Sequence, residues 1–254
     1  MLHTVIDLVR QTKEIIFDIK KVADVDVKGY GNYVTQVDVA VQNFLQERLL
    51  SLYPDIQFMG EEKSNEEIDF ARPVWVLDPI DGTANMMHSL GLSAVSLALV
   101  ENGQPTLGVV YNPFTEDLYA AEKGKGATLN GRPIHVSDTA RVHDSLIAIG
   151  TAPYHKELSE QNFKDFYRIY TSCEDIRRLG AAAIDLVSVA AGKMDAYFER
   201  VLNPWDIAAG IVILREAGGT VTDQNLGDIR LDCQVDILAT NSHIHRELHD
   251  ILSK

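Results

Sequence analysis

The chain has 254 residues, of which 46% are hydrophobic and 24% charged, a composition typical of soluble globular proteins. Its formal net charge of −14 argues against a nucleic-acid partner, which would select a basic patch or stripe. No apolar run approaches the roughly 20 residues of a membrane span, and charges among the first 14 residues argue against a signal peptide. We therefore expect a cytoplasmic protein without a membrane or nucleic-acid partner.

The N-terminal third predicts helices around a loop. Apolar residues recur at helical spacing over residues 2–22, and two glycines and an asparagine within residues 27–33 indicate a loop. A further helix begins after Thr35 and ends near residue 53. Asp38 follows Thr35 by three residues, as in a capping box, so that capping is the simpler interpretation of Asp38 from the residues alone.

Two predicted strands run directly into acidic residues. The strand at residues 56–59 leads to Glu61, and the apolar run at residues 74–77 leads to Asp78 and Asp81. If these strands are neighbours that end at one edge, Glu61 and Asp78 meet. Pro79 cannot continue a sheet ladder, so we expect a tight turn that directs both aspartates and the Ile80 carbonyl to one point.

Such oxygen atoms are hard ligands of the kind that Mg²⁺ takes. Gly82 and Thr83 then begin a predicted short helix, whose free N–H groups and positive end suit a phosphate. Bound cations would also reconcile an acidic chain with an anionic substrate. The alternative is that Asp78–Asp81 is an ordinary surface turn, and this segment alone does not decide between the two.

The remaining elements change character near residue 140. Strands are expected at 94–101, 106–111, 118–122 and 127–129, with a hairpin turn at Asn102-Gly103. Helices at 158–170, 181–191, 204–217 and 244–252 then alternate with strands at 175–179, 196–199, 220–222 and 236–239. We expect one catalytic unit over residues 1–254, with an α+β half at about 1–140 and an α/β half at about 141–254.

Asp206 lies in the first turn of the helix predicted at 204–217, where the helix dipole favours an acid. That role would explain Asp206 without a metal. The two cysteines, Cys173 and Cys233, have no metal-like spacing, and we expect buried thiols rather than a disulfide framework.

Three motifs occur in order along the chain: Gly60-Glu61-Glu62, WVLDPIDGT at 75–83, and WDIAAG at 205–210 followed by EAGG at 216–219. Together they resemble the inositol monophosphatase family of Mg²⁺-dependent, Li⁺-sensitive phosphatases, over nearly the whole chain. The resemblance implies a layered α/β fold of alternating helices and sheets, a homodimer, a small phosphate ester as substrate, and two to three Mg²⁺ ions, with Mn²⁺ as a substitute and Li⁺ as an inhibitor.

The resemblance also implies residue roles. A first Mg²⁺ would bind Glu61, Asp78 and the Ile80 carbonyl; a second would bind Asp78, Asp81 and Asp206; Glu61 would share a weaker third. Asp38 and Thr83 would orient and activate the attacking water, and Glu61 completes the catalytic set. The residues implied for substrate binding are Asp81, Gly82, Thr83, Ala182, Glu199 and Lys28.

Four positions depart from the family pattern: Asn32, Met86, Ala181 and the segment near Gly91. The family usually has an acid, an aromatic, a hydroxyl residue and a proline there, respectively. None of these departures removes an implied ligand. They leave the metal chemistry in place and make the substrate an open question.

The leading hypothesis is a Mg²⁺-dependent phosphomonoesterase that acts on a small polyol or sugar phosphate, with inositol 1-phosphate first. The same chemistry on fructose 1,6-bisphosphate, NADP(H), histidinol phosphate or 3′-phosphoadenosine nucleotides is an alternative. From another class, the chain could be an interaction protein of the transcription or RNA-processing machinery, with catalysis dispensable.

Overall fold

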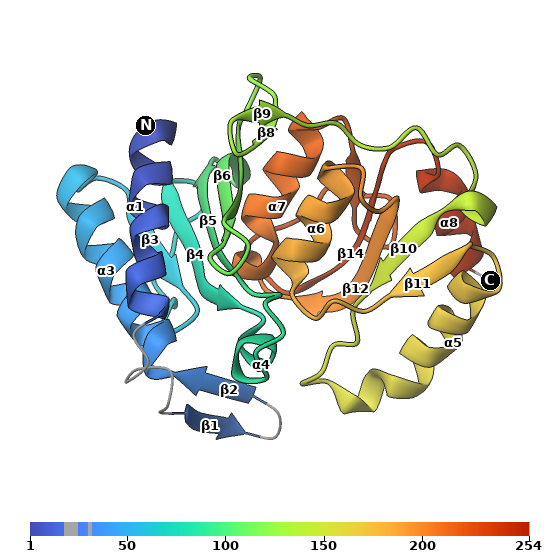
Figure 1. Ribbon diagram of the computed structural model, residues 1–254, viewed down its shortest axis with the longest axis horizontal. Coiled ribbons are helices and arrows are strands. Elements are labelled where there is room, and N and C mark those ends of the chain that lie inside the picture. The colour runs from blue at the N-terminus through green and yellow to red at the C-terminus, as the bar shows by residue number, and fades with distance from the viewer. Residues whose placement is uncertain (18–24, 30–31, 254) are drawn as a thin grey trace.

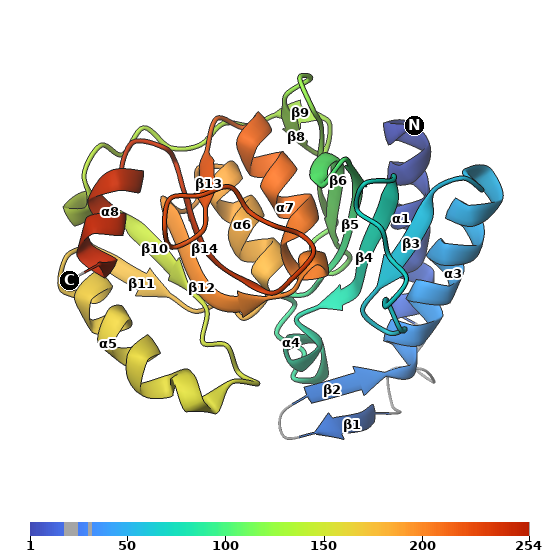
Figure 2. The same ribbon diagram turned by 180° about the vertical axis from the view of Figure 1, so that it is seen from behind.

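Helix layers and sheets alternate across the molecule in five layers (Figures 1 and 2). The computed structural model describes residues 1–17, 25–29 and 32–253, and only the backbone of 25–29 and 32–35. This arrangement confirms the layered fold of helices and sheets that the sequence led us to expect. In the described part of the chain, no helix is long and apolar enough to cross a membrane.

The larger sheet contains seven strands in the order β3-β4-β5-β6-β7-β8-β9. β3 and β4 are parallel, and every later neighbour is antiparallel. Asn102 and Gly103 both have positive φ and join β5 to β6, as the predicted hairpin requires. The strands are β3 (Gln57–Gly60), β4 (Val74–Asp81), β5 (Ala94–Glu101), β6 (Gln104–Asn112), β7 (Asp117–Glu122), β8 (Ala127–Leu129) and β9 (Arg132–Pro133).

The smaller sheet contains five strands in the order β11-β10-β12-β14-β13. β10 is parallel to both of its neighbours, and β14 is antiparallel to both of its own. β12 continues three residues beyond its predicted end and carries the chain towards the next helix. The strands are β10 (Leu146–Ile149), β11 (Asp175–Arg177), β12 (Ala196–Leu202), β13 (Thr220–Thr222) and β14 (Val235–Thr240).

Helices cover both faces of each sheet (Figure 1). α1 (Leu2–Ile16) and α3 (Gln36–Leu52) cover the outer face of the larger sheet, α6 (Ala182–Ala190) and α7 (Pro204–Glu216) lie between the sheets, and α5 (Ser159–Tyr170) and α8 (His245–Leu252) cover the smaller sheet. Along β4, Trp75 and Leu77 join the outer core while Val74 and Val76 join the middle one. Because both faces are covered, β4 is apolar at consecutive positions, as its sequence indicated.

Short elements complete the chain. α4 (Thr83–Met87) follows β4, and single turns of 3₁₀ helix occur at η1 (Val142–Asp144) and η2 (Lys156–Leu158). Both cysteines are free; Cys173 is half-buried and Cys233 is exposed, so the expectation of buried thiols was wrong for Cys233.

The N-terminal predictions need two corrections. α1 ends at Ile16, and residues 18–22 of the predicted helix lie outside the described residues. Where a loop was predicted, β1 (Val25–Gly29) and β2 (Asn32–Thr35) pair as antiparallel strands. The loop prediction was wrong because it gave Gly29 and Asn32 more weight than the strand-forming valines and tyrosine around them.

Pro79 does not end its strand in a turn. β4 continues to Asp81, but its pairing with β5 changes register between Asp78 and Asp81. Pro79 and Ile80 together stand opposite a single residue, Val95, which is the pattern of a β-bulge. The missing N–H of proline is therefore accommodated in a bulge, and the expected turn was wrong.

The middle layer packs against the larger sheet at Gly108 of β6. A Cβ atom added there would lie 2.6 Å from the carbonyl oxygen of Ala209 in α7 and would also meet Val212. We expect Gly108→Ala to lower the free energy of unfolding by roughly 1–3 kcal/mol, because a helix backbone cannot yield as a side chain can. Urea unfolding measures this, with Ser51→Ala on the exposed side of α3 as the control. Equal midpoints for the two variants would contradict the proposed contact.

Candidate metal and phosphate site

β3 and β4 end side by side and bring two predicted ligands to one edge. Gly60 pairs with Leu77, and the Glu61 N–H donates to the Leu77 carbonyl at 3.2 Å. Glu61 thus leaves β3 beside the position where Asp78 follows Leu77 in β4. The neighbouring strands that the sequence suggested are present in the structure.

The bulge in β4 shapes the backbone around the two aspartates. Asp78 Oδ1 accepts the Ile80 N–H at 2.9 Å. Gly82 follows with φ of 82°, and a Cβ atom there would lie 2.9 Å from both the Leu92 carbonyl oxygen and the Ala181 side chain. Only glycine fits this position, where the chain turns from β4 into α4.

A cavity of about 190 Å³ lies where these elements meet. Besides the predicted residues, its mouth is lined by Tyr154, His155, Arg178 and Gln234, which the sequence analysis did not single out. Asp38 is not among the lining residues, and the side chain of Lys28 lies outside the described part. The predicted residues that line the cavity are Glu61, Asp78, Ile80, Asp81, Gly82, Thr83, Ala182, Glu199 and Asp206.

Asp81 joins the larger sheet to the middle helices. Its Oδ1 accepts the Ala182 N–H at 3.1 Å and its Oδ2 accepts the Ala183 N–H at 2.7 Å. These are free amides of the first turn of α6, so Asp81 caps this helix across about 100 residues of sequence. The Ala182 amide, expected to contact substrate, is therefore held by Asp81 in this structure.

Asp206 makes a helix-capping contact and also lines the cavity. Its Oδ2 accepts the Asn203 N–H at 2.6 Å, as a residue in the first turn of α7 can. The same side chain is half-buried and lines the cavity. Capping therefore holds Asp206 without removing it from the proposed metal site.

Asp38 and Thr83 lie together, as the resemblance implied. The Thr83 hydroxyl is 3.2 Å from Asp38 Oδ1 and 3.0 Å from the Ile80 carbonyl oxygen, and its one proton can be donated to either. Asp38 is only 1% exposed, although it begins in the first turn of α3. The Asp38 carboxylate is therefore a buried hydrogen-bond acceptor for the hydroxyl of Thr83, which lines the cavity.

Glu199 forms a wall of the cavity and is held by residues that the sequence analysis missed. The Ala152 N–H donates to its Oε1 at 2.9 Å, and the Tyr197 hydroxyl donates to its Oε2. A Cβ atom at Gly150 would overlap the carboxyl group. Gly150 was the available sequence signal, whereas the contact with Ala152 had none.

Burial dominates the electrostatics of the acids. It raises the pKa of Asp81 to about 7, against the opposing effect of the α6 amides, and the pKa of Asp206 to about 8, with Asp81 as the next cause. Burial is the main cause, and the charge of Glu61 the second, that raises the pKa of Asp78 well above its ordinary value. Within the described residues, no lysine, arginine or histidine forms an ion pair with these three aspartates.

This donor set fits a divalent cation. Four carboxylates and a backbone carbonyl oxygen are hard ligands, and the buried carboxylates of Asp78 and Asp81 would gain from a bound cation. As the side chains stand, no group of three or more His, Cys, Asp or Glu in the described ranges is arranged to hold a metal ion. Like-charged groups in a buried site repel, so a cation would have to draw their oxygens together.

One further buried acid was also missed. Asp185 of α6 is 1% exposed, and its Oδ1 has no hydrogen-bond partner among the described residues. Burial, then Glu199 and Asp81, raises its pKa well above the ordinary value. Its place in an alanine-rich helix gave no sequence signal beyond its charge.

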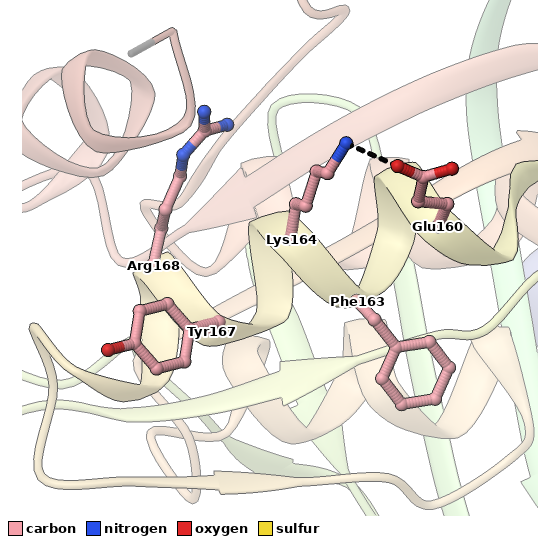
Figure 3. A pocket seen from close by; sticks show the side chains of 5 residues that line it. All are labelled: Glu160, Phe163, Lys164, Tyr167 and Arg168. Carbon is pink, nitrogen blue, oxygen red and sulfur yellow. Dashed lines mark hydrogen bonds and ion pairs between the residues drawn. The ribbon is translucent and has the colours of Figure 1, made fainter.

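A second hollow, on the outer face of α5, is not comparable. Phe163 and Tyr167 project from the helix with Lys164 bonded to Glu160 (Figure 3). All of its lining residues come from one helix, and Phe163 and Tyr167 are 66% and 70% exposed. It lacks the converging polar groups of a catalytic site.

Comparisons with known proteins show the family of the chain and support its fold. The inositol monophosphatase family matches residues 1–254. "Inositol-1-monophosphatase" of Synechocystis is 42% identical over 92% of this chain and 81% of its own length, and "Nus factor SuhB" of Xylella fastidiosa is 36% identical over 89% and 83%. The crystal structure of extragenic suppressor protein suhB from Bartonella henselae superposes with a TM-score of 0.90 at 34% identity, covering 99% of this chain and 98% of that one.

Because burial raises the pKa values of Asp81 and Asp206, stability without metal should depend on pH. The folded state holds protons that the unfolded chain releases near about pH 4, so stability falls as pH rises from about 4 to about 8 and is level above the folded-state pKa values. We expect the thermal midpoint in EDTA to fall over this range, and Mg²⁺ to remove most of the fall. Asp81→Asn should flatten the EDTA curve, whereas exposed Asp144→Asn should not. A wild-type curve in EDTA parallel to that in Mg²⁺ would contradict this prediction.

Proposed function

Since the chain belongs to the inositol monophosphatase family, we propose that it hydrolyses a small polyol or sugar phosphate, with inositol 1-phosphate as the first candidate. One observation carries the proposal. A single cavity is lined by four carboxylates, by Gly82 and Thr83 at the start of α4, and by the buried wall residue Glu199.

We assign the cations to the acids of this cavity. Two to three Mg²⁺ ions would be held by Glu61, Asp78, the Ile80 carbonyl, Asp81 and Asp206. When bound, Mg²⁺ offsets charge on the phosphoryl oxygens and makes a water molecule more acidic. That Mn²⁺ can replace Mg²⁺ and that Li⁺ inhibits stay predictions of the family resemblance.

The chain's own residues would handle the water and the phosphate. Thr83 can accept a hydrogen bond from the attacking water while it donates to Asp38, the buried residue that accepts the proton. Glu61, which directly follows the neighbouring strand β3, completes this set. The amides of Gly82 and Thr83 would hold phosphoryl oxygens at the start of α4.

The opposite wall would recognise the leaving alcohol. Glu199 and Asp81 offer carboxylate oxygens to the hydroxyl groups of a polyol, and Ala182 is the third residue proposed to contact them. Lys28 is proposed to close over the site. Tyr154 adds an aromatic surface at the mouth, so nucleotide phosphates belong in any test of substrate.

Phosphate release from a panel of esters tests the proposal. The panel contains inositol 1-phosphate, fructose 1,6-bisphosphate, NADP, histidinol phosphate and 3′-phosphoadenosine 5′-phosphate, each with Mg²⁺, EDTA or Mg²⁺ plus Li⁺. We expect turnover with Mg²⁺ and none with EDTA. Asp78→Asn should lower kcat/KM by more than about 100-fold, since it removes a ligand proposed for two ions. Exposed Asp232→Asn is the matched control, and full activity of Asp78→Asn in saturating Mg²⁺ would refute the assignment.

A second candidate function comes from relatives named "Nus factor SuhB", such as the one from Xylella fastidiosa. In that case the chain would act mainly by binding a protein, with catalysis dispensable. The complete set of cavity acids favours the phosphatase. Background rates on the whole panel, from protein that binds Mg²⁺, would favour the interaction role instead.

A homodimer stays a prediction. Sedimentation velocity separates the 28.2 kDa chain from a species of twice that mass, and we expect the heavier one. A single species at the mass of one chain, over a range of concentrations, would contradict it.

A further inference from the structure

β12 leaves its regular register where it reaches the cavity. Glu199 pairs with Ile237 and Leu202 pairs with Val235, which leaves Arg200 and Val201 both opposite Asp236 of β14. Two residues facing one define a β-bulge. All five residues from Glu199 to Asn203 line the cavity.

The bulge depends on an unfavourable backbone conformation. Val201 has φ of +57°, in the left-handed region that a β-branched residue rarely adopts. Its N–H donates to Asp236 Oδ1 at 2.8 Å. β14 thus supplies a hydrogen-bond acceptor for Val201, the residue of the bulge with the least favourable backbone conformation.

The side chain of Arg200, the other residue of the bulge, is held by residues of α5 and β14. Its Nη1 donates to Asn162 Oδ1 at 2.8 Å and its Nη2 to Asp165 Oδ2 at 2.7 Å, both on α5. Its Nε lies 3.5 Å from Asp236 Oδ2, and its guanidinium lies 4.9 Å from the Phe198 ring centroid. Asp165 is fully buried. Asp236 therefore contacts both residues of the bulge.

We propose that Asp236 is a positioning residue of the cavity wall. By accepting the Val201 N–H and pairing with Arg200, it holds the bulge and so keeps Glu199 directed into the cavity. Its effect on substrate rests on the proposed function, because Glu199 would contact the hydroxyl groups of the leaving alcohol. Its effect on the backbone does not rest on that function.

A set of variants separates positioning from simple loss of structure. Asp236→Ala removes the acceptor, and we expect KM for inositol 1-phosphate to rise about tenfold, with a much smaller change for p-nitrophenyl phosphate, which has no hydroxyl groups for Glu199. Adding Val201→Gly should bring KM back to within about twofold, because glycine adopts positive φ without help. Val201→Ala should not restore KM, since its Cβ keeps the conformational cost.

Two controls complete the set. Asp236→Asn keeps an oxygen acceptor for the Val201 N–H but loses the ion pair with Arg200, so its KM should lie between those of wild type and Asp236→Ala. Exposed Asp144→Ala, which removes an ion pair with Arg141 far from the cavity, should leave KM unchanged. Urea unfolding of the same variants should show Val201→Gly raising the midpoint more in Asp236→Ala than in wild type.

The outcomes distinguish the two proposals. If Val201→Gly restores neither KM nor the midpoint of Asp236→Ala, or if both substrates lose equally, the positioning role is overturned. Wild-type protein that hydrolyses no ester would refute the proposed function. In that event the urea measurements alone decide whether Asp236 holds Val201.

Discussion

The removal of neighbouring carboxylates from water is the constraint on which the site depends. Asp78 and Asp81 are buried and Asp206 is half-buried. Loss of solvent and, after it, the charges of neighbouring acids raise the pKa of all three. Removing a charge from water without a partner is costly, so such a group persists only where donors or cations compensate it. Each acid here accepts at least one backbone N–H, and the donors are amides that a bulge or a helix start leaves free.

The same compensation explains the irregular strands. β4 and β12 each place two residues opposite one where they reach the cavity, at Pro79-Ile80 and at Arg200-Val201. A regular strand would send alternate side chains away from the cavity. A bulge redirects them, at a conformational cost of order 1–3 kcal/mol for a residue such as Val201. Both bulges occur in otherwise well-buried strands, so the surrounding core can sustain this cost.

The sequence predicted the local elements better than their distant contacts. The Asn102-Gly103 hairpin, the α7 start at Pro204 and the neighbouring β3 and β4 carried signals in their own residues. The N–H of Ala152 on Glu199 and the α6 amides on Asp81 join positions 47 and about 100 residues apart, and no local pattern encodes them. The bulge at Val201 could not be predicted from the sequence either, because valine favours a regular strand. The β-branched residues of β1 and β2 did carry a signal, which the glycines nearby outweighed.

The two sheets contribute different parts of the cavity. Glu61, Asp78, Asp81 and Thr83 come from the larger sheet and its helix, whereas Glu199 and Ala152 come from the smaller sheet and its loops. Under the proposed function, Glu199, which would contact the alcohol, therefore lies in a different stretch of the chain from Glu61, Asp78 and Thr83, which would serve bond cleavage. Substitutions between residues 150 and 203 could change substrate preference in descendants while the residues from 61 to 83 stay as they are. Substrate specificity could then diverge without any change in the residues proposed to carry out hydrolysis.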